Sequence, residues 1–455
     1  MNYFGYDIGT VADFYIAPIC FFLIIYISRH TVKINDPWEQ KVFNNALILK
    51  LLSGLLICAI YIFYYKGGDT IIYMHDALIL ENVFWKLPSD YFDFLFNGMY
   101  DTEKGRINLW KHFFHLRDYN LEYFSYRHDE RAFFVARLAS ICAIITGGSF
   151  YSTSMLFGTF AAIGVWKLYK IFAEYYPVFK RQLIYTVIFI PSVMFWGAGV
   201  LKDPITFGAL CFLMHNFHNI LKRRNIASSV IGCLIYGFIL LAIKPYILNA
   251  FIVGIGSWVL SNYLVKIKSV VFQVLLLPLL LGFSIGIVMF FLDVLGSDTG
   301  KYSLEKVLDE AALVQNDLKQ DYYGGHRFDI GTFEPTIGGV LSKAPIAIFT
   351  TLYRPFIWEA KNIFVFISAL EATVILIFTF IAIFRIKIYN LQGILLINPI
   401  LFFSFIFSLF FSFFLGLTTA NFGALVRYKI PLMPFYVSMV YILSNYAKVP
   451  KKQKD

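Results

Sequence analysis

Asp69 is the residue whose type and place most strongly suggest chemistry. It follows Gly67 and Gly68, directly after the apolar run 46–64, so we expect it at a membrane surface, close to the hydrocarbon. A carboxylate in that place can accept the proton of an attacking hydroxyl group. The structural alternative is that Asp69 or Thr70 caps the helix that follows. Asp76 is a weaker candidate, because a water-exposed face of that helix would hold it without any function.

Four cations form a second group of candidates. Each lies in a short turn that we expect on the outer side of the membrane, where the usual charge bias would not place it: Lys202, Lys244, Arg354 and Arg427. A cation near hydrocarbon costs free energy unless it is paired. One interpretation is pairing with Asp203, Glu359 or lipid phosphate, or simple snorkelling. The functional interpretation is a pocket for a phosphate or pyrophosphate group, which Arg and Lys both bind.

Two further outer positions carry polar groups. Glu359 can pair with Arg354 or Lys361 and fix the entry of the next span. His326 and Arg327, in a Gly-rich outer stretch, can bind substrate or belong to a mobile lid. Histidines and cysteines show no metal-ligand spacing, so we predict no zinc site. The Gly-rich phosphate loop of soluble nucleotide-binding proteins is absent, which argues against an ATP-driven enzyme.

Composition defines the scaffold that must position these residues. The chain has 455 residues, of which 58% are hydrophobic and 15% charged, and its mean hydropathy is +0.66. Soluble domains carry about 25% charged residues, so a soluble globule is excluded. The net charge of +10 is explained by basic cytoplasmic loops, and we expect no nucleic-acid partner. The sequence therefore predicts an all-α polytopic membrane protein.

Apolar runs and basic clusters predict the topology. About eleven runs are long enough to span a bilayer: 12–28, 46–64, 150–168, 183–198, 204–220, 228–243, 246–263, 269–292, 362–384, 395–416 and 428–445. The shorter runs 133–147 and 344–356 each contain an arginine, and we expect them to be interfacial or re-entrant. All basic clusters then lie inside, with the N-terminus outside and the C-terminus cytoplasmic.

We interpret residues 1–455 as a single integral membrane domain. Two long segments face outside, 66–132 and 293–361, and 446–455 forms a basic cytoplasmic tail. Membrane-surface helices are expected in the first segment. In the second, Leu304, Leu308, Ala311 and Leu318 recur at helical spacing, which predicts an amphipathic helix on the membrane.

Three short motifs, taken in order, resemble the GT-C class of membrane glycosyltransferases. Asp69, Tyr73 and Ala77 are similar to that family's Asp-x-x-x-Tyr-x-x-x-Ala pattern, near the start of a long external loop. The segment from Pro191 to Pro204 resembles a later family segment, and the run 427–434 is similar to an Arg-Tyr-x-x-Pro run that opens a late span. The chain departs from many members by an additional first span and by Thr70 in place of a second acid.

The resemblance implies transfer of a sugar from a polyprenyl-phosphate donor to the hydroxyl of a glycan, lipid or protein acceptor. Asp69 would be the base, and Lys202, Lys244, Arg354 and Arg427 would hold the lipid phosphate. Direct displacement would invert the sugar carbon, and a divalent cation at Asp69 stays open as a cofactor. The expected location is a bacterial cytoplasmic membrane, with the active site facing outside, in assembly of the cell envelope.

Two alternatives remain open. A polysaccharide polymerase or ligase acting on lipid-pyrophosphate oligosaccharides also needs outer cations. A lipid-glycan flippase or transporter predicts inverted repeats and charges near the midplane. No repeat is found, and Lys50 and Glu371 are the exceptions to a pattern of charges at the outer edge.

Overall fold

The chain is an almost entirely helical membrane protein. The computed structural model describes residues 2–3, 6–11, 13–98, 124–126, 128–264, 328–331, 337–386 and 388–450. Near its start, β1 (Asn2–Tyr3) pairs antiparallel with β2 (Tyr6–Asp7). All other regular elements in the described ranges are helical. The all-α class predicted from composition is thereby confirmed.

Six of the described helices are long and apolar enough to cross a membrane. They are α1 (Asp13–Thr31), α2 (Pro37–Ala59) with its π-helical end η1 (Ile60–Tyr64), α7 (Phe150–Tyr175), α11 (Ile226–Ile243), α17 (Ile363–Ile386) and α19 (Pro399–Thr418). The start of α2 shows how sequence sets such a boundary. Asp36 accepts a hydrogen bond from the Trp38 amide at 3.0 Å, and Pro37 occupies the first helical turn.

The remaining expected spans are not among these six helices. Residues 183–198 fall into α8 (Lys180–Leu183), η4 (Ile184–Ile188) and α9 (Pro191–Trp196), because Pro191 lacks an amide hydrogen and disfavours helix at the residue before it. Other expected spans coincide with α10 (Lys202–Leu221), α12 (Pro245–Leu264) and α21 (Met433–Ser444), which are outside the six. The run 269–292 and the predicted helix around Leu308 lie outside the described residues.

The two short runs form helices of different length. The first is α6 (Glu130–Thr146), with 17 residues, and the second is α16 (Ala344–Tyr353), with 10 residues. At about 1.5 Å per residue, α16 is only about 15 Å long, half of a bilayer core of about 30 Å. A helix of that length cannot cross alone, as the arginine at its end suggested.

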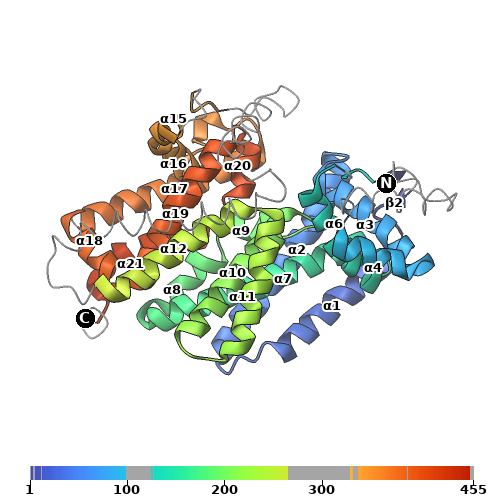
Figure 1. The fold of residues 1–455 in the computed structure, drawn as a ribbon, viewed down its shortest axis with the longest axis horizontal. Helices are drawn as coiled ribbons and strands as arrows, with labels where there is room; N and C mark the ends of the chain where they lie inside the picture. The colour runs from blue at the N-terminus through green and yellow to red at the C-terminus, as the bar shows by residue number, and fades with distance from the viewer. Residues whose placement is uncertain are drawn as a thin grey trace. The chain divides into compact units, whose positions relative to one another are not determined.

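Two compact units divide the chain. Unit 1 comprises Met1–Leu168 and Met194–Lys244, and unit 2 comprises Tyr169–Val193 and Pro245–Asp455. The prediction of one membrane domain stays a prediction. In unit 1, α3 (Asp69–Lys86) packs against α4 (Pro88–Asn97) and α6, and α10 packs along α11 (Figure 1).

In unit 2, α12 and α16 both pack on α19, and α17 packs on α21 (Figure 1). Gly416 of α19 permits the close approach of α16, because a side chain there would overlap the carbonyl oxygen of Ala347. The unit also contains short elements: η3 (Pro177–Phe179), α15 (Ile337–Ser342), η6 (Ile357–Glu359), α18 (Ile388–Ile397), α20 (Phe422–Tyr428) and η7 (Tyr446–Lys448).

Candidate functional site

Asp69 is positioned by a sharp turn at the end of a helix, α2 with η1, that is long and apolar enough to span a membrane. Lys66 and Gly68 both have positive φ, 53° and 100°, which ends the helix after η1. A Cβ on Gly68 would lie 3.0 Å from the Tyr61 ring, so both conformation and space favour glycine there. The Gly68 carbonyl accepts the amides of Ile71 and Ile72, and α3 begins at Asp69. The carboxylate is therefore placed directly beyond the span.

The alternative that Asp69 or Thr70 caps α3 is wrong. The N-cap position of α3 is Gly68, and neither Asp69 nor Thr70 occupies it. Asp69 is partly exposed in the first turn of α3. Most of α3 is buried in protein rather than spread on a membrane surface, since Ile71, Ala77 and Leu80 are all fully buried, although Trp85 in its last turn is exposed.

Asp76 anchors the loop residues 124–126 to α3 through hydrogen bonds. Its two carboxylate oxygens accept the backbone amides of Ser125 and Tyr126, each at 2.9 Å, and one of them also contacts His75 Nδ1 at 3.0 Å. The side chain is fully buried. Buried carboxylates need such donors, and these ones are supplied by the loop. The contacts favour a positioning role for Asp76 over the substrate contact that the sequence suggested.

Tyr126 is the group that this loop presents beside Asp69. Its ring stacks on Tyr73, with centroids 4.8 Å apart and planes at 26°. Burial raises the pKa of Tyr126, and the negative charge of Asp69 raises this pKa further, with smaller effects of Asp76 and Asp129. The phenol therefore stays protonated at neutral pH. Nothing in the local pattern of 124–126 marks this tyrosine, so sequence reasoning missed it.

Lys202 pairs with Asp129, which, like Tyr126, the sequence patterns did not indicate. Its Nζ lies 3.3 Å from Asp129 Oδ2, and the two side chains are 23% and 49% exposed. Asp129 also caps α6, because its Oδ1 accepts the Ala132 amide at 3.0 Å. An aspartate shortly before an apolar run is a recognisable cap signal, although the pattern does not reveal that Asp129 pairs with Lys202. Lys202 is thus a reachable, paired cation at the start of α10.

Lys244 is far more enclosed. Its Nζ donates to Asp203 Oδ1 at 2.6 Å, and the side chains are only 7% and 1% exposed. Asp203 lies in the first turn of α10 and Lys244 follows the end of α11, so the pair joins two packed helices. This is the pairing interpretation that the sequence left open. It favours a positioning role for Lys244.

The elements that carry these charges share one hydrophobic core. Ile71 of α3, Leu201 before α10 and Ile243 at the end of α11 all belong to the same buried cluster. Each is within two residues of Asp69, Lys202 or Lys244, so the cluster ties the three charged positions to one scaffold. This part of unit 1 can receive a proton at a carboxylate and neutralise an anion at an exposed lysine.

Unit 2 carries the other predicted residues. Arg354 Nε donates to both oxygens of Glu359, at 3.0 and 3.2 Å, and its Nη2 contacts the same carboxylate. The guanidinium carbon lies 5.4 Å from the Phe328 ring and 5.1 Å from the Phe422 ring. Glu359 therefore pairs with Arg354, one of the two partners considered for it.

Arg427 lies half-buried in the last turn of α20, with its guanidinium carbon 5.9 Å from the Tyr428 ring. His326 and Arg327 lie outside the described residues. Asp69, Tyr73, Lys202 and Lys244 belong to unit 1, whereas Arg354, Glu359 and Arg427 belong to unit 2. The prediction that all four cations hold one lipid phosphate stays a prediction.

A search for metal ligands covered the part of the chain that the structure describes. There, no group of three or more His, Cys, Asp or Glu side chains could hold a metal ion. No protein-family model, no curated protein and no solved structure matches the chain.

Proposed function

We propose that the chain is a membrane glycosyltransferase that moves a sugar from a polyprenyl-phosphate donor to an acceptor hydroxyl on the outer side of the membrane. One observation carries the proposal: a partly exposed carboxylate, Asp69, begins a buried helix directly beyond a membrane-spanning helix. The glycine turn before it fixes this place. A base for a membrane-bound donor has to lie at this boundary, because the donor's phosphate stays at the membrane surface.

In the proposed reaction, Asp69 takes the proton of the acceptor hydroxyl as its oxygen attacks the anomeric carbon of the donor. The bond between that carbon and the phosphate oxygen breaks, and polyprenyl phosphate leaves with the electron pair. Lys202 neutralises the leaving phosphate, since its side chain is partly exposed, whereas that of Lys244 is enclosed. Lys244 and Asp76 support this arrangement from buried positions.

The Tyr126 phenol completes the proposed site. Because it stays protonated beside Asp69, its hydroxyl can donate a hydrogen bond to the acceptor or to a sugar oxygen. Its stacking on Tyr73 and the anchoring of its backbone by Asp76 fix the ring before substrate arrives. Preorganised donors of this kind stabilise developing charge without reorganisation.

The decisive experiment compares Asp69→Asn with Asp93→Asn in the full-length protein. Asp93 is an exposed residue of α4 whose carboxylate accepts the Asn97 amide at 2.6 Å, and it is outside the proposed site. Membranes containing each variant are supplied with a panel of labelled polyprenyl-phosphate sugars, and sugar transfer and released polyprenyl phosphate are measured. We expect Asp69→Asn to lower the transfer rate by about 100-fold or more, because general-base catalysis contributes that much.

Asp93→Asn should transfer sugar at the wild-type rate. Full transfer by Asp69→Asn at normal membrane abundance would overturn the assignment of the base. Product length distinguishes the neighbouring hypothesis, since a polymerase would release lengthened glycan chains instead of adding one sugar. Lipid translocation that needs no sugar transfer, and that Asp69→Asn leaves intact, would indicate a flippase.

A further inference from the structure

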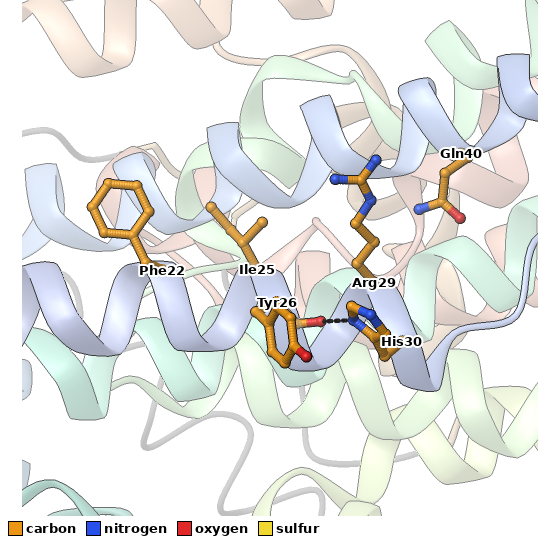
Figure 2. Close-up of a pocket in the computed structure, with 6 residues that line it drawn as sticks. All are labelled: Phe22, Ile25, Tyr26, Arg29, His30 and Gln40. Carbon is orange, nitrogen blue, oxygen red and sulfur yellow. Dashed lines mark hydrogen bonds between the residues drawn. The ribbon is translucent and has the colours of Figure 1, made fainter.

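A hollow separates α1 from α2 in unit 1. Its volume is about 560 Å³, and its lining residues are Phe22, Ile25, Tyr26, Arg29, His30 and Gln40 (Figure 2). Five of the six belong to α1, and Gln40 belongs to the first turns of α2. The proposed transfer reaction uses none of them.

The lining changes character along α1. Phe22, Ile25 and Arg29 follow one another at helical spacing on a single stripe. The seven helical steps from Phe22 to Arg29 correspond to about 10 Å along the helix. One leaflet contributes about 15 Å of hydrocarbon. The hollow therefore has an apolar end at the depth of acyl chains and a cationic end at the depth of headgroups.

The polar end is built around Arg29. His30 Nδ1 donates to the Tyr26 carbonyl at 2.8 Å, and the two rings lie 4.3 Å apart. Gln40 Nε2 donates to Asn44 Oδ1 at 3.0 Å. Figure 2 shows the Arg29 side chain extending from α1 toward the helix that carries Gln40. Within the described ranges, no carboxylate forms an ion pair with this guanidinium. Its planar donors suit a phosphate group.

Two acids near this end do not cancel its charge. Asp36 is engaged as the cap of α2, where it accepts the Trp38 amide, and the Glu39 side chain is buried. Lys33 in the connection between the helices and Lys41 near the start of α2 are both exposed. By the bias of basic residues, this connection lies on the cytoplasmic side, where anionic lipids are enriched.

Lipid has access to the hollow because α1 is poorly covered by protein. Only 11% of its apolar window is buried, in contrast to 44% for the α2 window. We propose that the hollow binds one anionic phospholipid of the cytoplasmic leaflet. Its phosphate contacts Arg29, and an acyl chain lies along Phe22 and Ile25. Such a lipid fills the space between α1 and the rest of unit 1.

Native mass spectrometry of the purified full-length protein tests this proposal. Phosphatidylglycerol or phosphatidylcholine is added in turn, and the retained lipid is counted for wild type, Arg29→Gln and Lys33→Gln. Both variants lose one positive charge, but Lys33 is outside the hollow. We expect Arg29→Gln to lower phosphatidylglycerol retention about tenfold, because it removes a charge-assisted contact. Lys33→Gln should stay within about twofold of wild type, as screened surface charges do.

A substitution that fills the hollow gives an independent test of lipid binding. Ile25→Trp should lower retention of phosphatidylglycerol while leaving Arg29 in place, because the indole occupies the path of the acyl chain. Equal losses in Arg29→Gln and Lys33→Gln would overturn the proposal in favour of unspecific surface attraction. Wild-type retention in Arg29→Gln, or equal retention of phosphatidylcholine and phosphatidylglycerol by the wild type, would overturn it as well.

Discussion

At the scale of single residues, exposure separates cations that are otherwise alike. Lys202 and Lys244 both pair with an aspartate, but the first pair is partly open to solvent and the second is enclosed. An exposed pair exchanges its partner easily and contributes about 0–1 kcal/mol to stability. A buried pair cannot lose one member without leaving an uncompensated charge. The same residue type is therefore suited to anion binding in one place and to helix positioning in the other.

Removal of Lys244 tests this distinction. Lys244→Met leaves the Asp203 carboxylate buried without its main partner, and we expect it to cost about 3–5 kcal/mol of stability. The loss is read as a lower temperature at which the detergent-solubilised protein stops running as a single species in gel filtration. Lys202→Met is the control and should change that temperature little. The double variant Asp203→Leu, Lys244→Met should recover most of the loss. Equal behaviour of both single variants would contradict the distinction.

At the scale of elements, the turn between α2 and α3 determines where Asp69 lies. Gly68 combines a φ of 100° with the Tyr61 ring only 3.0 Å from the position of a Cβ. A side chain there has to shift the ring or the backbone. Either movement changes the start of α3, and with it the place of the carboxylate.

Gly68→Ala is therefore expected to destabilise the protein by about 1–3 kcal/mol, the cost of a strained backbone, and to reduce sugar transfer at the proposed site. Gly237→Ala in α11 is the matched control, since no neighbouring atom lies within 4 Å of a Cβ there. In a helix interior that change should be neutral or stabilising by about 0.5–1 kcal/mol. Thermal unfolding and transfer are measured on the same preparations. An unchanged Gly68→Ala protein would show that the turn does not position Asp69.

Elements also show how far the sequence predicts this fold. Apolar length identified α1, α11 and α17, because each is a continuous run with clear ends. It failed at 183–198, where the run is apolar throughout but Pro191 and the π-helical segment before it interrupt the helix. Hydropathy reports which residues prefer lipid or protein interior, and it is insensitive to such interruptions.

Sequence patterns identified those residues of the candidate site that stand in a recognisable local pattern. They missed the residues that come close to the site only through tertiary structure. Asp69 stands out by its place after an apolar run and two glycines. Tyr126 and Asp129 reach the site only because the loop folds back on α3 and α10, through contacts such as Asp76 with the Tyr126 amide. Residue types at 124–129 are ordinary for any loop, so their partners follow from tertiary structure alone.

At the scale of the whole molecule, the proposals depend on one topology. The bias of basic residues predicts that the connection of α1 and α2 lies in the cytoplasm and the turn before Asp69 outside. The catalytic proposal needs the outer position for Asp69, and the lipid proposal needs the cytoplasmic position for Arg29. Both positions are separated by a single span, α2 with η1, of 28 residues.

Accessibility of single cysteines tests that topology. All five native cysteines are free thiols, and Cys58 and Cys211 are buried. They are first replaced by serine or alanine, and a variant without cysteine provides the blank for labelling. Lys66→Cys and Lys33→Cys then introduce exposed thiols on the two sides of α2. We expect a membrane-impermeant maleimide to label Lys66→Cys in intact cells and Lys33→Cys only after lysis. The reverse labelling pattern would show that the protein has the opposite orientation in the membrane. It would contradict both the outer position of the base and the cytoplasmic position of the lipid site.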